Sequence, residues 1–92
     1  MIRTFRHEGL RSLFETGELS DVSAEMSRKL LRQLDFLNRA ASPGDLDLPG
    51  YRLYVLKGER EGTWSVRVSG NCVLTLTFRG GDASDVDLED YH

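Results

Sequence analysis

The chain has 92 residues, of which 39% are hydrophobic, and this is enough apolar material for one small core but not for two. Its net charge of −3, from 15 acidic and 12 basic side chains, is not that of a protein that holds nucleic acid through bulk charge alone. One cysteine excludes an intramolecular disulfide and a cysteine-based metal site. The sequence has no long apolar run and no signal-peptide pattern, so we expect one cytoplasmic domain, residues 1–92, with no membrane contact.

The first elements expected along the chain are a short strand and a short helix. Residues 1–6 alternate between apolar and polar types, which predicts the strand. Between Gly9 and Gly17, apolar residues follow the i, i+3, i+4 spacing of an amphipathic helix. His7, beside this helix, is interpreted as a surface residue without a role.

A second, longer helix is expected next. Residues 20–23 supply candidates for its N-cap, and the stretch 42–45 ends it. We interpret its apolar stripe as core packing; the stripe comprises Met26, Leu30, Leu34, Leu37 and Ala41, thickened by Leu31 and Phe36. The basic residues beside the stripe form either a solvated face or a surface for RNA or a partner, and they are Arg28, Lys29, Arg32 and Arg39.

Four strands are expected in the second half of the chain, at 51–58, 63–68, 72–78 and 83–88. Gly70-Asn71 is expected to form a two-residue hairpin turn, because glycine tolerates the positive φ that such turns need. Period-two alternation places one set of side chains from the two central strands on an apolar face, namely Trp64, Val66, Val68, Cys72, Leu74, Leu76 and Phe78. The order of elements predicts an α+β fold, with two N-terminal helices packed on a small antiparallel β-sheet.

The opposite face of the central strands is polar and holds Arg67, whereas Val73 is the one apolar residue on that face of its strand. If the protein has a site, we expect it on this polar face or at its edges. In the last strand we expect Ser84, Val86 and Leu88 on one face and Ala83, Asp85 and Asp87 on the other. Five acidic residues lie between Asp82 and Asp90; they form either a solvated face or a docking face for a basic partner.

Five motifs occur together along the chain. They are Ile2-Arg3-Thr4-Phe5-Arg6-His7, Leu13-Phe14-Glu15-Thr16-Gly17, Leu56-Lys57-Gly58-Glu59-Arg60, Trp64-Ser65-Val66-Arg67-Val68 with Gly70-Asn71, and Asp87-Leu88-Glu89-Asp90-Tyr91-His92. In this combination the chain resembles, from end to end, the HigB-type toxins of the plasmid maintenance system killer family, a branch of the RelE toxin superfamily.

The resemblance implies a type II toxin–antitoxin system, with a compact antiparallel sheet flanked by two helices. It implies a ribosome-dependent endonuclease that cuts messenger RNA. It also implies neutralisation by a HigA-type helix-turn-helix antitoxin, and the toxin would contact operator DNA only through this antitoxin. It also implies cleavage without a metal or cofactor, in which the ribose 2′-OH attacks the adjacent phosphate and leaves a cyclic phosphate and a 5′-OH. That chemistry needs a proton acceptor, cations around the phosphate and a proton donor.

The resemblance assigns catalytic roles to Lys57, Arg67, Asp90, Tyr91 and His92. Lys57 and Arg67 would stabilise the charged phosphate, and His92 would transfer protons, because an unperturbed imidazole titrates near neutral pH. Asp90 would orient His92, accept a proton or merely repel RNA, and Tyr91 would stack on a base or bind a phosphate oxygen.

Three further candidates for RNA binding are Tyr54, Arg60 and Arg79. Without the resemblance, each charged candidate would be interpreted as a solvated side chain, and His92 as a residue of a frayed chain end.

Two dipeptides in this sequence depart from the pattern of the family. Cys72-Val73 stands where Trp-Arg is usual, and Tyr54-Val55 stands where His-Pro is common. Val73 cannot supply a cation to the phosphate, and such a loss costs on the order of 2–4 kcal/mol in the transition state. Cys72 is interpreted as a small buried hydrophobe in a looser core.

Three hypotheses for the function follow from the sequence. The first is an active ribosome-dependent ribonuclease under antitoxin control. The second is a weakened or inactive toxin fold that binds its antitoxin and acts in operator regulation, which Val73 and Tyr54 favour. The third is a small α+β binding domain unrelated to toxins, which would bind neither a ribosome nor a helix-turn-helix partner.

Overall fold

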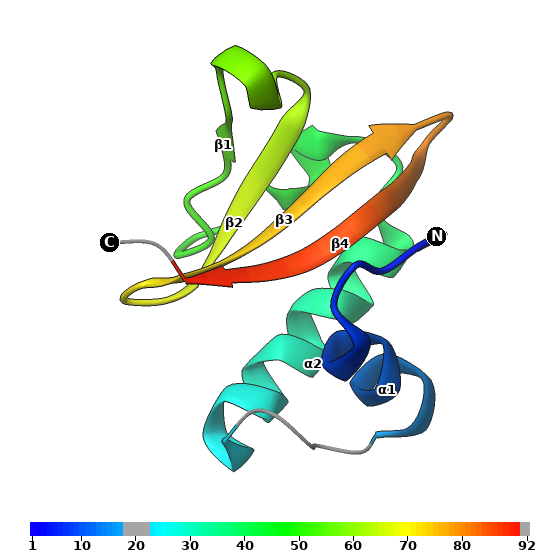
Figure 1. Cartoon of the computed structure of the whole chain (residues 1–92), viewed down its shortest axis with the longest axis vertical. Helices are drawn as coiled ribbons and strands as arrows, with labels where there is room; N and C mark the ends of the chain where they lie inside the picture. Colours follow the sequence, from blue (N-terminus) through cyan, green and yellow to red (C-terminus); the bar gives the residue numbers. More distant parts are fainter. Residues whose placement is uncertain (18–22, 91–92) are drawn as a thin grey trace.

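The architecture comes from a computed structural model, which describes residues 1–17 and 23–90. Two helices, α1 (Glu8–Thr16) and α2 (Ala24–Arg39), precede a four-stranded antiparallel sheet with the order β1-β2-β3-β4 (Figure 1). The strands are β1 (Tyr54–Val55), β2 (Thr63–Ser69), β3 (Cys72–Arg79) and β4 (Asp82–Asp90), and two short 3-10 helices, η1 (Pro43–Leu46) and η2 (Gly58–Arg60), lie in the connections. The predicted α+β class, with two N-terminal helices and an antiparallel sheet, is confirmed.

Side chains at the helix starts accept hydrogen bonds from the first free amides. Nδ1 of His7 accepts from the Leu10 amide at 3.1 Å, so His7 is the N-cap of α1. The prediction that His7 has no role was therefore wrong. Oγ of Ser23 accepts from the Met26 amide at 3.2 Å and caps α2, whereas the other N-cap candidates, residues 20–22, lie outside the described residues.

The core lies between the helices and one face of the sheet. Its helical part is fully buried and comprises Leu10, Leu13, Leu30, Leu34 and Leu37, and its sheet part comprises Val66, Val68, Leu74, Leu76, Ala83 and Val86. Met26, Phe14, Trp64 and Cys72 are partly buried against this cluster. The two helices and the sheet therefore share the core, and the other face of the sheet lies outside this cluster.

Three residues of the predicted α2 stripe lie elsewhere. Leu31 and Phe36 remain 41% and 37% exposed, because each is one residue, or about 100° of helical rotation, away from a fully buried position. Ala40 is buried in place of Ala41, which is exposed. The helix ends at Arg39, so its period no longer determines which alanine faces the core.

The predicted strand 51–58 was too long, because β1 contains only Tyr54 and Val55. Arg52 has a left-handed backbone with φ of 48°, and Gly58 has φ of 76°, so the extended conformation is interrupted on both sides. The register of β1 with β2 pairs Tyr54 with Ser65. The chain between the two strands instead carries η2.

A β-bulge in β4 changes which of its residues face the core. Thr75 pairs with Asp87 but Thr77 pairs with Ser84, so β4 has one extra residue, and Asp85 adopts a left-handed φ of 55°. Ala83 and Val86 are consequently both fully buried. The prediction that Ser84 shares the face of Val86 and that Ala83 opposes it was wrong, since strict alternation does not continue through a bulge.

Residues 1–6 lie beside β4 and pair with it in parallel through two isolated bridges, Ile2 with Ala83 and Phe5 with Val86. Hydrogen bonds of 2.8 Å run from Arg3 N to Ala83 O and from Arg6 N to Val86 O. The segment predicted as a first strand is thus extended and paired, but it does not belong to the antiparallel sheet.

The turn at Gly70-Asn71 joins β2 and β3, because Ser69 and Cys72 are paired. This confirms the two-residue hairpin, but neither turn residue has a positive φ, contrary to the reason given for the glycine. In the described part of the chain, no helix combines the length and the apolar character that crossing a membrane requires.

Substitution of Leu34 tests the placement of the core. Leu34 is fully buried, so Leu34→Ala should lower the free energy of unfolding by about 2–5 kcal/mol through lost transfer energy and a cavity. Leu31→Ala, on the exposed side of the same helix, should change it by only about 0.5 kcal/mol. Urea unfolding followed by circular dichroism measures both, and equal losses would contradict this orientation of α2.

Candidate functional site

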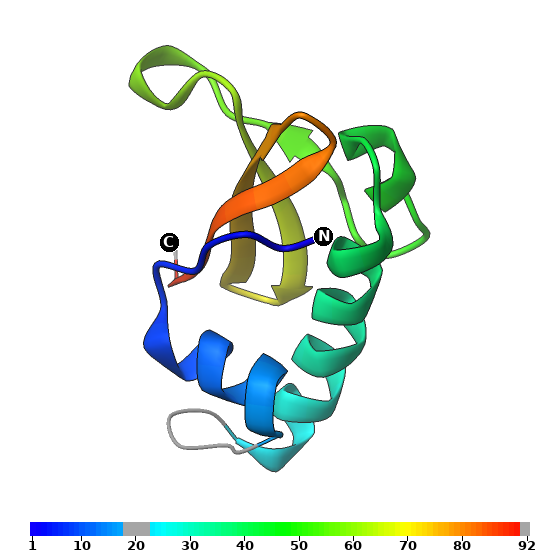
Figure 2. The same cartoon turned by 90° about the vertical axis from the view of Figure 1, so that its right-hand side faces the viewer.

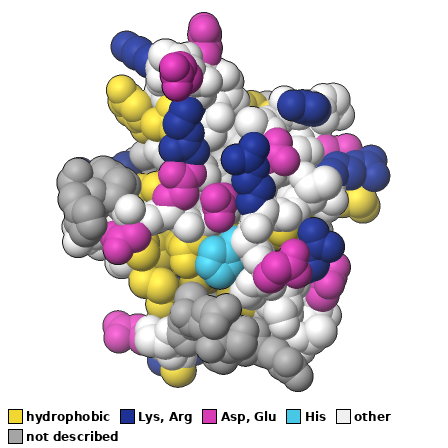
Figure 3. Space-filling model, in the orientation of Figure 1, with side chains coloured by type: hydrophobic (Ala, Val, Ile, Leu, Met, Phe, Trp, Pro, Cys, Tyr) yellow, Lys and Arg dark blue, Asp and Glu magenta, His cyan; other side chains and the backbone are white. Residues whose placement is uncertain are grey.

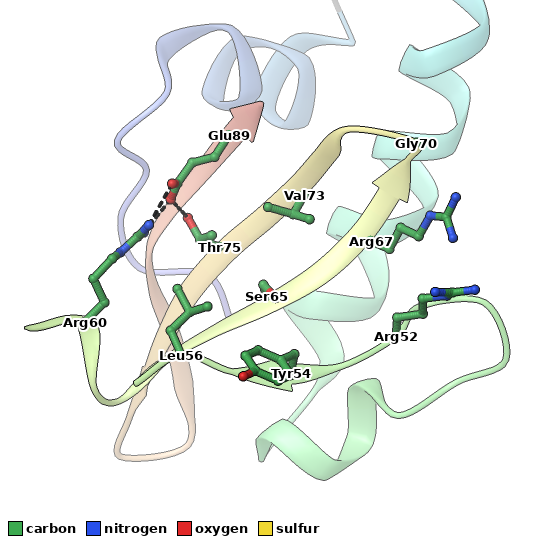
Figure 4. A pocket seen from close by; sticks show the side chains of 10 residues that line it. All are labelled: Arg52, Tyr54, Leu56, Arg60, Ser65, Arg67, Gly70, Val73, Thr75 and Glu89. Carbon is green, nitrogen blue, oxygen red and sulfur yellow. Dashed lines mark hydrogen bonds and ion pairs between the residues drawn. The ribbon is translucent and has the colours of Figure 1, made fainter. Parts of the chain in front are cut away.

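The polar face of the sheet carries a cavity of about 560 Å³, within the usual size range for small-molecule sites. Its lining comes from β1, β2, β3, β4 and the connections between them and comprises Arg52, Tyr54, Leu56, Arg60, Ser65, Arg67, Gly70, Val73, Thr75 and Glu89 (Figure 4). We call this cavity the sheet pocket. Its position agrees with the expectation that a site would lie on the polar face.

Strand pairing brings the side chains of the sheet pocket together in rows. Arg67, Val73 and Glu89 are neighbours across β2, β3 and β4. Tyr54, Ser65 and Thr75 form the next row, from β1 to β3. Val73 is only 7% exposed, so it forms an apolar floor between a cation on one side and a carboxylate on the other.

One end of the sheet pocket holds two guanidinium groups, those of Arg52 and Arg67, which project in the same direction in Figure 4. Within residues 1–17 and 23–90, neither group has a carboxylate within 4.0 Å. Two unpaired guanidinium groups at one end make that end suitable for an anion, since their planar forks match phosphate oxygens.

The backbone of Arg67 is held on both sides. Its amide donates to the carbonyl of Tyr51 at 2.6 Å, and its carbonyl accepts from Nε2 of Gln33 at 2.8 Å. Gln33 is a buried residue of α2, so the helix beneath the sheet fixes the strand position from which Arg67 extends. The direction of Arg52 depends instead on its left-handed backbone, a conformation that few non-glycine residues adopt.

The other end of the sheet pocket is occupied by an ion pair. Nη1 of Arg60 donates to Oε1 of Glu89 at 2.8 Å, and Nη2 donates to Oε2, so the pair is bidentate. The hydroxyl of Thr75 also donates to Oε2 of Glu89, at 2.6 Å. The dashed lines of Figure 4 mark this three-residue group.

The ion pair changes how both side chains ionise. The hydrogen bonds from Arg60 lower the pKa of Glu89 from its ordinary value, and together with the Thr75 hydroxyl they outweigh the opposing effect of partial burial. The hydrogen bond to Glu89 in turn raises the pKa of Arg60. Glu89 is thus an anion near neutral pH and a poor proton donor, and it neutralises the positive charge of Arg60.

An aromatic ring stands at the edge of the sheet pocket. Tyr54, on the edge strand β1, lines the pocket and is 55% exposed. An exposed ring that lines the same pocket as unpaired guanidinium groups can stack on a nucleic-acid base while the cations bind a phosphate of the same strand. Acidic and basic side chains are intermingled over the face that Figure 3 views, which offers no broad basic surface there.

The predicted site residues are only partly brought together. Arg67, Tyr54 and Arg60 line the sheet pocket, but Arg60 is paired with Glu89. Three other predicted residues are exposed and do not line it: Lys57 precedes η2 as its N-cap, Arg79 ends β3, and Asp90 ends β4. Tyr91 and His92 lie outside the described residues.

Four polar residues of the sheet pocket are absent from the predicted site: Arg52, Ser65, Thr75 and Glu89. Alternation along β2 and β3 does place Ser65 and Thr75 on the polar face, and this signal could have identified them. Glu89 requires the register of β4 beyond its bulge, and Arg52 requires a backbone conformation that its residue type disfavours.

Comparison with known proteins gives two findings. Residues 3–92 match the family HigB-like toxin, described as "RelE-like toxin of type II toxin-antitoxin system HigB". The chain is also 41% identical, over 92 residues and the full length of both proteins, to a protein of Proteus vulgaris named Endoribonuclease HigB.

The Arg60–Glu89 pair predicts a pH-dependent stability. Because the pKa of Glu89 in the folded protein lies below its ordinary value of 4.5, the pair stabilises the fold above pH 4.5 and this contribution disappears as pH falls through the folded value. The difference in free energy of unfolding between the unmodified protein and Glu89→Gln should therefore be larger at about pH 7 than at about pH 3. Urea unfolding across this range measures it; Arg60→Gln should show the same trend, and a difference independent of pH would contradict the assignment.

Proposed function

Because the chain belongs to the HigB-like toxin family of type II toxin–antitoxin systems, we propose that it is an endoribonuclease that cuts messenger RNA on the translating ribosome. The observation that carries the proposal is the sheet pocket, which two unpaired guanidinium groups and an exposed tyrosine ring line together. This combination suits one nucleotide of a single strand, with its base on the ring and its phosphate on the cations.

The proposed reaction is transfer of the phosphate within the RNA strand. The ribose 2′-oxygen loses its proton and attacks the adjacent phosphorus, the bond from phosphorus to the 5′-oxygen breaks, and that oxygen takes up a proton. The products are a 2′,3′-cyclic phosphate and a 5′-OH. Arg67, Arg52 and Lys57 supply the positive charge that the phosphate needs as it gains negative charge.

Proton transfer is assigned to the sequence Asp90-Tyr91-His92. Glu89 lines the sheet pocket, so the end of β4 lies beside it, and this placement of the strand end supports the assignment, although the side chain of Asp90 itself is on the opposite face from Glu89. Glu89 itself is unsuited to donate the proton, since its pKa is lowered by Arg60. His92 is the proposed acid or base, with Asp90 orienting it and Tyr91 contacting the base or the phosphate.

The proposed partners follow from the same assignment. A HigA-type helix-turn-helix antitoxin neutralises the toxin, and the toxin contacts operator DNA only through this antitoxin. The ribosome presents the messenger RNA. With a net charge of −3, the free protein has little general attraction for RNA, so we expect cleavage to depend on the ribosome for positioning the substrate.

A second candidate function is that of a weakened toxin that binds its antitoxin and acts in operator regulation. The observation that favours it is the charge of the sheet pocket: Val73 forms an apolar floor, and Glu89 neutralises Arg60. Both features reduce the positive charge available to a phosphate. The two candidates differ in whether the unmodified chain cuts RNA at a significant rate.

Controlled expression tests the first candidate. The unmodified chain should arrest growth and cut messenger RNA on ribosomes, whereas Arg67→Ala should slow cleavage by about 10²–10³-fold because a transition-state cation is lost. His92→Ala should also abolish growth arrest. Arg28→Ala, which removes the same charge from an exposed position of α2, is the matched control and should retain activity. Equal activity of Arg67→Ala and Arg28→Ala would contradict the proposed role of the sheet pocket.

Val73→Arg separates the two candidates. It introduces a guanidinium group between Arg67 and Glu89 and, where Arg60 keeps its pair with Glu89, should raise the cleavage rate of a weakened enzyme by about tenfold or more. Val73→Met adds length without charge and is the control. If only Val73→Arg arrests growth, the unmodified chain has the second function; if Val73→Arg and the unmodified chain cut equally fast, the apolar floor does not limit catalysis.

A further inference from the structure

The connection between β1 and β2 stands out from one end of the sheet, and the side chain of Arg60 reaches from it to the polar face. It enters β2 at Thr63, which pairs with Thr77, whereas Glu89 lies further along the sheet, opposite Val73. Arg60 nevertheless contacts Glu89, which belongs to the opposite edge strand in the order β1-β2-β3-β4. Figure 2 shows this connection on the side of the sheet away from α2.

Little else holds this connection to the rest of the protein. Residues 57–62 are all exposed, and within the described part of the chain Arg60 alone among them forms a side-chain hydrogen bond or ion pair. Gly58 and Gly62 have positive φ angles of 76° and 92°, with open space where a Cβ would lie. The connection thus has a glycine near each end and one side-chain attachment between them.

The attachment point on β4 is itself held in place. Thr75 donates its hydroxyl to the carboxylate of Glu89, which limits the positions from which that carboxylate can receive Arg60. Oxygen Oε2 of Glu89 therefore accepts from both side chains. The carboxylate of Glu89 is thus an acceptor fixed on β4, and the part that can move is the β1–β2 connection.

Glu89 does not suit a role in RNA binding. Its carboxylate lies in the wall of a pocket whose other end is cationic, so it repels phosphate and occupies the guanidinium group of Arg60. The benefit of the pair lies elsewhere: Lys57, the N-cap of η2, is three residues from Arg60, and Asp90 directly follows Glu89. The pair thus links the segments that carry the proposed cation and the proposed proton-transfer residues.

We propose that Arg60 and Glu89 form a latch that holds the β1–β2 connection at the edge of the sheet pocket and so positions Lys57 for RNA cleavage. Both are positioning residues, which act through Lys57 without contacting the reacting phosphate. The part concerning cleavage rests on the proposed function, whereas the holding of the connection does not. Opening of the latch leaves the fold intact, because the connection contributes no buried side chain.

Limited proteolysis tests whether the pair holds the connection. Glu89→Gln keeps the shape of the side chain but removes its charge, and trypsin should then cut after Lys57 about three- to fivefold faster than in the unmodified protein. Asp85→Asn is the matched control, because it removes the same charge from the same strand at a residue that faces Arg6 and not Arg60, and it should not accelerate this cut. Arg60→Glu combined with Glu89→Arg should restore protection. Equal cutting rates for all variants would overturn the latch.

Single-turnover cleavage on ribosomes tests the positioning role. Glu89→Gln should lower the rate constant for cleavage by about tenfold while leaving ribosome binding within about twofold, because Lys57 is misplaced but Arg52, Tyr54 and Arg67 stay in the sheet pocket. The exchanged pair should recover much of the rate. Faster cutting by trypsin with an unchanged rate of RNA cleavage would overturn the positioning role. Tighter ribosome binding would also overturn it, because the effect of Glu89 would then be to weaken RNA binding. If the unmodified protein cuts no RNA, the proposed function fails, and proteolysis alone still decides whether the latch exists.

Discussion

The pairing of β2 with β3 is the constraint on which both the core and the sheet pocket depend. It places Val66 opposite Leu74 on the buried face and Arg67 opposite Val73 on the other face. A shift of β2 by one residue would bury Arg67 and expose Val66, so the free energy of core packing fixes the position of the guanidinium group. Gln33 reinforces this register, because a buried side chain of α2 donates to the carbonyl of Arg67. The stability of the hydrophobic core thus determines the geometry of the polar site.

Most of the fold follows from periodicity, which this sequence displays clearly where packing is regular. The stripe of α2 and the alternation of β2 and β3 identified Leu30, Leu34, Val66 and Leu74 as core residues, as the structure confirms. Periodicity failed where the backbone departs from a regular conformation. Strict alternation cannot reveal the extra residue at the β4 bulge, and an extended run cannot reveal the left-handed residue that shortens β1.

The site was less predictable than the fold, because its chemistry depends on pairs between distant residues. Arg60 looks like a free cation in the sequence, but Glu89, 29 positions later, neutralises it. Arg52 lies in a stretch that reads as a strand, and only its actual backbone shows that its side chain lies at the cationic end of the pocket. The resemblance to toxins identified residue types that suit the chemistry, whereas the ionic partner of each residue is a property of the folded chain. The balance of charge in the sheet pocket therefore could not be derived from composition.

Val73 and the Arg60–Glu89 pair have to be considered together. Val73 lies between Arg67 and Glu89 in one row of the sheet, and its side chain offers no hydrogen-bond donor to the carboxylate. Glu89 is therefore free to receive both nitrogens of Arg60, with Thr75 as its second donor. An arginine at position 73 would be a second guanidinium group beside the same carboxylate and would compete with Arg60 for it. The apolar floor reduces the positive charge of the sheet pocket, and it also leaves Glu89 available to hold the β1–β2 connection. In this protein, phosphate binding and the position of the connection are thus coupled through one carboxylate.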